Sequence, residues 1–304
     1  MSFNDNAQFD PSRVSDRRGR GGRGRGVAVG GGLGGGLILL LSLFFGPGVV
    51  DQLGLDGSSG TDSGFTEDSD PAINACQTGE DANRQLDCRI LGTAESLDSF
   101  WAPYLEPYGI RYTPPGVVLF SGQTDTGCGT ASSAVGPFYC PADEQTYYDT
   151  AFFDDLVTRF GASAGPLAQE YVIAHEFGHH IQNLTGALSA SQQDPRGAES
   201  GAVRVELQAD CYAGMWAAHA TSVPDPESGV PFLREFTRTD LQDALSAASA
   251  VGDDRIQEST TGQVNPEAWT HGSSEQRQAW FLQGLETGDI EACDTFAAND
   301  LDNP

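Results

Sequence analysis

Apolar residues recur at helical intervals along much of the chain, and this pattern predicts most of its secondary structure. Residues 93–105 carry Leu97, Phe100 and Trp101 at three- and four-residue spacing, as one face of a helix requires. Four further stretches show the same period. They are residues 166–184, 199–220, 239–251 and 274–286.

Three short runs ahead of these last helices are rich in Val, Phe and Tyr, which favour strands. They lie at residues 117–120, 135–140 and 145–148. A small sheet followed by a series of helices is the order expected of an α+β domain. We therefore predict an α+β fold for the folded part of the chain.

Residues 27–50 contain no charged residue, although eight of the 24 positions are Gly. As a helix this stretch would span about 36 Å, enough to cross the ~30 Å hydrocarbon core of a bilayer. A cleaved signal peptide is the alternative, but no small-x-small cleavage site follows Phe45. We predict a transmembrane anchor at residues 27–50.

The segments on either side of residues 27–50 differ from a folded domain in composition. Residues 1–26 are polar and rich in Arg and Gly, so they are predicted to be a disordered tail. Residues 51–71 consist largely of Gly, Ser and Asp and are predicted to be a flexible linker. The folded domain is expected over residues 72–304.

Charge predicts the orientation of the chain. Residues 1–26 carry six Arg and three acidic residues, whereas the remainder carries ten Arg and forty acidic residues. By the positive-inside rule the N-terminus is cytoplasmic, residues 27–50 cross the cell membrane once, and residues 72–304 lie outside the cytoplasm. We interpret the basic tail as a topology determinant rather than a contact for nucleic acid or anionic lipid. The acidic domain itself is not expected to bind nucleic acid.

The six cysteines form no C-x-x-C pair, which argues against a structural zinc site and favours disulfides in an oxidising compartment. Equal spacing suggests bridges of Cys76 with Cys88 and of Cys128 with Cys140, and Cys211 would then pair with Cys293. Six cysteines allow fifteen connectivities, and buried free thiols are the alternative.

His175 and His179 lie four residues apart in the predicted helix 166–184, with Glu176 between them. Residues four apart share one helical face, so both imidazoles can bind one metal ion. A zinc ion with an open coordination position lowers the pKa of its bound water towards ~7, and a neighbouring carboxylate can accept the proton as the water attacks a carbonyl. The spacing predicts a zinc-dependent hydrolase with Glu176 as the base.

A catalytic zinc needs a third protein ligand. The Gly and His that extend the motif in metzincins are replaced here by Gln182 and Thr185. Glu206 and Asp210 lie on one face of the predicted helix 199–220. We predict that Glu206 binds zinc and that Asp210 accepts a hydrogen bond from the second nitrogen of a ligand histidine.

His271 lies just before the last predicted helix. It is a candidate donor to the oxyanion that forms when water attacks a carbonyl. The alternative is that this stretch only starts the helix, with Ser273 or Ser274 as the N-cap.

Three segments resemble the neutral zinc metallopeptidase family of bacterial membrane-anchored proteins. They are Ala174–Gln182, Glu206–Gly214 and Phe138–Asp143. The similarity runs from about Cys76 to Cys293. The resemblance implies a zincin-like fold in which the ligands are His175, His179 and Glu206 and the base is Glu176.

These observations predict a zinc metallopeptidase that hydrolyses peptide bonds of a peptide or protein substrate outside the cytoplasmic membrane. One alternative is a non-catalytic binding or scaffold protein stabilised by zinc. Glu176 and the open coordination position argue against it, because a structural zinc site needs neither. The other alternative is a hydrolase of a non-peptide amide or ester, which has the same site chemistry.

Overall fold

The computed structural model describes residues 2–18 and 72–304 of the chain. The predicted anchor at residues 27–50 and the predicted linker at residues 51–71 lie outside the described residues. Within the described ranges, no helix is both long enough and apolar enough to cross a bilayer.

The main sheet has four strands in the spatial order β1-β2-β6-β5. Strands β1, β2 and β6 run parallel, and β5 pairs antiparallel with β6 at one edge. Their bounds are β1 Val14–Asp16, β2 Gly116–Phe120, β5 Phe138–Cys140 and β6 Gln145–Asp149. A separate hairpin joins β3 (Gln123–Thr126) to β4 (Gly129–Ser132). The three predicted strands are confirmed as β2, β5 and β6.

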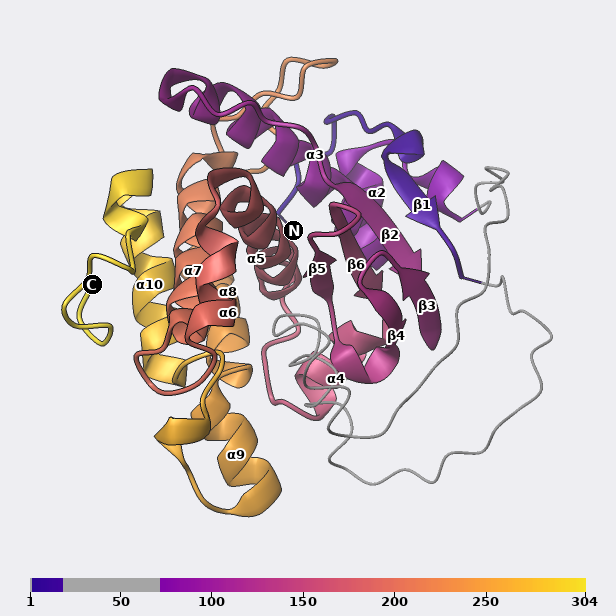
Figure 1. The fold of residues 1–304 in the computed structure, drawn as a ribbon. Coiled ribbons are helices and arrows are strands. Elements are labelled where there is room, and N and C mark those ends of the chain that lie inside the picture. The colour runs from indigo at the N-terminus through magenta and orange to yellow at the C-terminus, as the bar shows by residue number, and fades with distance from the viewer. Residues whose placement is uncertain (1, 19–71) are drawn as a thin grey trace.

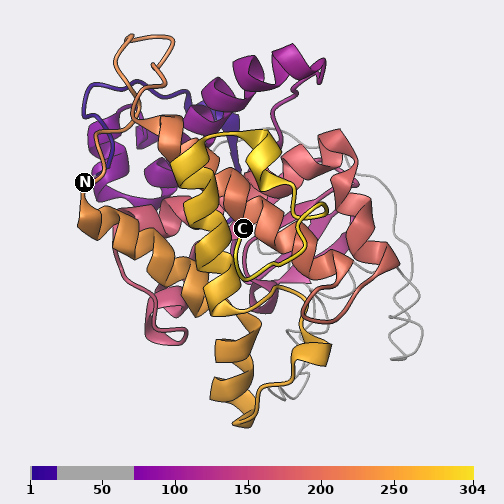
Figure 2. The same ribbon diagram turned by 90° about the vertical axis from the view of Figure 1, so that its left-hand side faces the viewer.

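Helices pack beside the sheet, with α5 next to the edge strand β5 (Figure 1). Viewed from the helical side, α10 lies in front (Figure 2). The helices are α2 Gly79–Arg84, α3 Leu86–Leu105, α4 Ala151–Thr158, α5 Pro166–Thr185, α6 Ala190–Gln193, α7 Gly201–Ala220, α8 Arg238–Ala250, α9 Asp253–Thr261 and α10 Ser274–Thr287. The five predicted helices are confirmed as α3, α5, α7, α8 and α10, and the fold is α+β.

Local sequence explains where these helices begin and end. The side chains of Ser200 and Ser273 accept hydrogen bonds from backbone N–H groups in the first turns of α7 and α10. Thr237 and Asp240 form a capping box at the start of α8. Gly186 ends α5 in the left-handed conformation, with φ of 85°, which a residue with a side chain rarely adopts.

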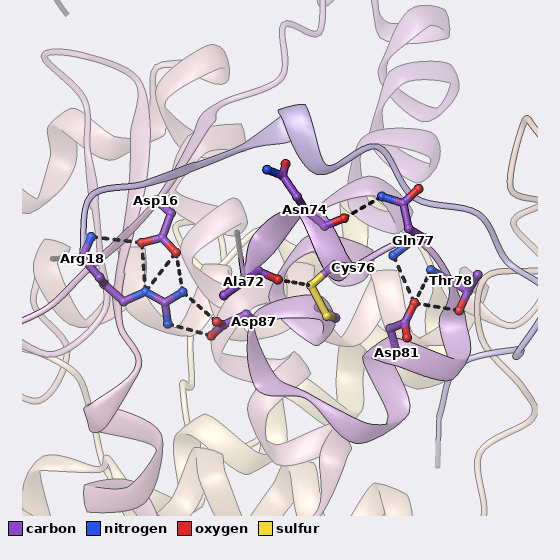
Figure 3. The surroundings of a disulfide bond; sticks show 10 residues. Asp16, Arg18, Ala72, Asn74, Cys76, Gln77, Thr78, Asp81 and Asp87 are labelled. Atoms are coloured by element: carbon purple, nitrogen blue, oxygen red, sulfur yellow. Dashed lines mark hydrogen bonds and ion pairs between the residues drawn. A yellow bond between two sulfur atoms is a disulfide. The ribbon is translucent and has the colours of Figure 1, made fainter. Parts of the chain in front are cut away.

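Three disulfides connect the fold, and they are the three pairs that spacing suggests. Cys76–Cys88 joins the start of the domain to α3 (Figure 3). Cys211–Cys293 joins α7 to the segment after α10. No described cysteine is free.

The prediction of a disordered tail is wrong for residues 2–18. This segment carries strand β1 and buries the side chains of Phe3, Phe9 and Val14 in the main core. Its few apolar residues suffice because they enter a core built by the rest of the chain, so the segment does not need a core of its own.

Candidate metal centre

Helix α5 carries both histidines of the motif on one buried face. The ring centroids of His175 and His179 are 4.7 Å apart, with an angle of 85° between the ring planes. Each of the residues His175, Glu176 and His179 is at most 7% exposed. The four-residue spacing therefore places both rings at one point, as the sequence predicts.

Helix α7 crosses α5 closely and brings Glu206 to the same point. A Cβ atom on Gly178 would lie 3.0 Å from the Cα atom of Ala209, so a larger residue would push the helices apart. The carboxylate oxygens of Glu206 lie 3.3 Å from Nε2 of His175 and 3.5 Å from Nε2 of His179. One candidate ligand atom from each of these three side chains lies within 4.8 Å of the others.

The outer nitrogen of each ring is held by a polar side chain. Nδ1 of His175 lies 2.8 Å from Oδ1 of Asp210, and Nδ1 of His179 lies 2.9 Å from Oε1 of Gln182. The amide nitrogen of Gln182 donates to the carbonyl oxygen of Val205, so its oxygen faces the ring as an acceptor. Each Nδ1 therefore carries a proton, which leaves Nε2 of each ring, on the side of Glu206, as the nitrogen that can bind a metal ion.

Arg277 on α10 completes the surroundings of Asp210. Its Nε donates to Oδ2 of Asp210 at 2.8 Å and its Nη2 donates to Oδ1 at 2.9 Å. The hydroxyl of Tyr171 also donates to this carboxylate. Because Asp210 is wholly buried, these partners keep it charged and fix the orientation of His175. Arg277 was not predicted from the sequence, and only its position as a charged residue within an apolar helical pattern could have indicated it.

His271 lines the cavity that holds His175, Glu176 and Glu206. Oδ2 of Asp253 accepts the backbone N–H of His271, and Oδ1 lies 3.2 Å from Nδ1 of its ring. Burial alone would lower the pKa of His271, but the charges of Asp253 and Glu206 outweigh burial and raise it. The contacts with Asp253 therefore favour the protonated form of the ring. Asp253 was missed by the sequence analysis.

The same stretch also starts α10, because Ser273 is the N-cap. The two interpretations of residues near His271 are thus compatible: Ser273 caps the helix and His271 faces the cavity.

Burial raises the pKa of Glu176 to about 7. The carboxylate of Glu206 adds to this effect, and the positive charges of His175, Arg277 and His271 oppose it. A group with a pKa near neutrality is suited to exchange a proton with a reactant.

The cavity beside these residues has a volume of about 390 Å³. Its lining includes the polar side chains of the histidines, Glu176 and Glu206 together with several apolar side chains. The apolar lining residues include Val135, Phe138, Phe152, Phe160, Val172 and Ile256. Gly136 has φ of 79° and passes against the ring of Phe152, which lets the segment before β5 border the cavity.

The donor set fits a zinc ion. Zn²⁺ prefers imidazole nitrogen and carboxylate oxygen at ~2.1 Å, and a tetrahedral arrangement separates such atoms by about 3.4 Å. The distances from Glu206 to the two rings agree with that separation. Two imidazoles and one carboxylate would hold the ion with three ligands, the number that protein side chains supply in catalytic zinc sites.

Comparison with known proteins gives a family but no described activity. The chain is 54% identical over 254 residues to an uncharacterized protein of Mycobacterium tuberculosis, Rv2575, covering 84% of this chain and 83% of that protein. It is 38% identical over 296 residues to an uncharacterized protein of Escherichia coli, YpfJ, covering 94% and 96% respectively. No solved structure matches the chain significantly. The profile of the family described as "Putative neutral zinc metallopeptidase" matches residues 4–296, so the chain belongs to that family.

Proposed function

We propose that the protein is a zinc-dependent peptidase whose ligands are His175, His179 and Glu206. The observation that carries the proposal is the convergence of these three side chains, with Glu176 beside them, on one cavity. Family membership supports zinc and peptidase chemistry in general terms.

When bound, a zinc ion supplies Lewis acidity, which polarises a carbonyl group and makes a water molecule more acidic. Glu176 accepts the proton of the attacking water and passes it to the leaving amine. Asp210, held by Arg277, keeps the ring of His175 in the orientation and tautomer that a ligand needs.

His271 donates a hydrogen bond from Nε2 to the oxygen that becomes negatively charged during the attack. Asp253 suits His271 to this role because it favours the protonated form of the ring, and a charged donor stabilises an oxyanion more than a neutral donor does. This proposal extends the sequence-based prediction for His271 by adding Asp253 as the residue that orients it.

The substrate is proposed to bind as an extended peptide along β5. This strand has a neighbour on one side only within the described sheet, so its other edge can form main-chain hydrogen bonds. The apolar lining residues Phe152, Phe160 and Val172 support a preference for a bulky apolar residue next to the cleaved bond.

The domain is proposed to work outside the cytoplasm. Three disulfides and no described free cysteine favour an oxidising compartment. The prediction of a membrane anchor at residues 27–50 rests on sequence alone.

The decisive experiment compares the full-length protein with Glu176→Gln, measuring zinc content and cleavage of an unfolded protein substrate. Glu170→Gln is the matched control, because it makes the same change on the same helix away from the cavity. We expect zinc in all three proteins and a fall in kcat of about 10²–10⁴-fold only in Glu176→Gln.

Zinc binding without activity in the parent protein would favour the scaffold alternative. Activity on esters or small amides, but on no peptide, would favour the non-peptide hydrolase. Absence of zinc from the parent protein would overturn the site.

A further inference from the structure

Residues 2–18 are joined by backbone hydrogen bonds to three separate parts of the domain. Ser2 and Asn4 exchange bonds with the loop before α8, at Arg234 and Phe232. Ala7 and Phe9 bond to the residues that start α2, as the bridge between Gln8 and Thr78 shows. Further on, β1 adds to the main sheet in parallel with β2, as Figure 1 shows.

Two glycines of the domain, Gly79 and Gly92, allow this segment to pack closely against it. The rings of Phe3 and Phe9 lie against Gly92 of α3, where an added Cβ atom would lie 2.8 Å or less from each. At Gly79 an added Cβ atom would lie 1.9 Å from the carbonyl oxygen of Asn4. Phe3 has no exposed surface, so removing the segment would open a gap in the main core.

Charged and polar side chains fix the segment at several points. Arg13 bonds to Asp98 of α3 at 2.7 Å, and Arg18 bonds to Asp87 at the same distance. Figure 3 shows Arg18 between Asp16 and Asp87, close to the Cys76–Cys88 disulfide. The hydroxyl of Ser2 donates to the buried carboxylate of Glu170 on α5, the helix that carries both histidines.

These contacts constrain where the segment can be in a cell. Asp87 precedes Cys88, so Arg18 binds a part of the domain that is closed by a disulfide. Disulfides persist in oxidising compartments outside the cytoplasm. A single membrane crossing between residues 18 and 72 would place the segment and the domain on opposite sides, where one chain could not form these contacts.

We propose that residues 2–18 are a constitutive part of the domain and lie with it on the extracytoplasmic side. The segment is then not a cytoplasmic tail, contrary to the positive-inside prediction, and this proposal replaces the sequence-based prediction of a single crossing at residues 27–50. The family match begins at residue 4, so the segment belongs to the sequence that defines the family, as an integral part of a domain should. This inference is independent of the peptidase proposal, since it uses no residue of the metal centre.

The test is a disulfide between two introduced cysteines in the full-length protein in intact cells. Gln8 and Thr78 form an isolated antiparallel bridge of the type without mutual hydrogen bonds, whose Cα atoms are ~4.5 Å apart, a separation that a disulfide can span. The double variant Gln8→Cys with Thr78→Cys also carries an inserted protease site between residues 51 and 71. After cleavage, only a link between residues 8 and 78 holds the two fragments together on a denaturing gel run without reductant.

We expect the fragments to stay joined in most molecules of this variant. The control pairs Gln8→Cys with Ala102→Cys, an exposed position of α3 beyond the contacts of the segment, and should give no link. Fragments that separate in both variants would overturn the proposal. So would a link found only between two chains, or one that forms only after cell lysis.

A second measurement does not depend on cross-linking. Phe3→Ala should lower the melting temperature of the full-length protein by on the order of 10 °C, because a fully buried ring leaves the core. Phe296→Ala, which removes a ring that is 39% exposed, should lower it little. Equal melting temperatures of Phe3→Ala and the parent would show that the segment does not dock.

Discussion

Two buried carboxylates on α5, Glu170 and Glu176, have the same perturbed pKa and different surroundings. Burial raises the pKa of each to about 7. Glu176 faces a cavity beside two histidines, whereas Glu170 meets the hydroxyl of Ser2 and the guanidinium of Arg89 at 3.9 Å. A shifted pKa thus marks a buried acid, and only the groups around it separate a reactive site from a structural contact.

If the surroundings of Glu176 make it reactive, replacing its neighbour His271 should have the largest effect on activity. Replacing it by Ala should lower kcat by about 10²–10³-fold with zinc affinity unchanged, because an oxyanion donor acts only in the transition state. His219→Ala is the matched control. His219 lies in the last turn of α7, where its ring contacts the carbonyl of Gly288, and it does not line the cavity. Steady-state kinetics and zinc content decide the question, and a change in KM alone would contradict the role.

A smaller effect is expected from Arg277, which acts on the metal centre through Asp210. Arg277→Met should lower zinc affinity by about 10–100-fold, because Asp210 loses two charged hydrogen bonds and holds His175 less firmly. A titration against a competing chelator measures this, with Arg255→Met on the surface of α9 as the control. Equal zinc affinity in both variants would show that Arg277 does not contribute to zinc binding.

The smallest effect concerns stability at the other end of α5. The folded-state pKa of Glu170 is about 7, above the ordinary value of 4.5, so the folded state binds this proton more tightly than the unfolded state. The free energy of unfolding therefore falls as pH rises from 4.5 to about 7. Arg89 opposes the shift and Asp240 adds to it.

Glu170→Gln removes this titration, so its stability should fall less than that of the parent over the same pH window. Urea unfolding at several pH values within and above the window measures the two slopes. Parallel slopes for parent and variant would show that Glu170 is not the group responsible.

The sequence predicted the parts of the fold that have strong local signals. The period of α5 and α7 is regular, and the short β runs are rich in β-branched and aromatic residues. The hairpin of β3 and β4 was missed because its strands hold mostly Thr, Ser, Gly and Asp. The short helices α2, α4, α6 and α9 lack enough turns to show a period.

The site residues with a local sequence signal were likewise predicted, and those without one were missed. His175, Glu176 and His179 are neighbours in sequence, and Glu206 with Asp210 has a recognisable helical spacing. Arg277 and Asp253 reach the site only through tertiary packing, because nothing in their local sequence points to a metal. The docking of residues 2–18 was missed for a similar reason: three apolar side chains are too few to predict burial until their partners on α3 are known.

The Cys211–Cys293 disulfide encloses residues that surround the metal centre but not its proposed ligands. It closes a loop of 82 residues that contains Asp253, His271 and Arg277 but neither histidine ligand. Closing such a loop lowers the chain entropy of the unfolded state by an amount worth about 4–5 kcal/mol of stability. Newly made chains that have not yet been oxidised would lack this restraint on the groups that orient and assist the ligands. On the proposed function, full activity would thus depend on oxidation of Cys211 and Cys293.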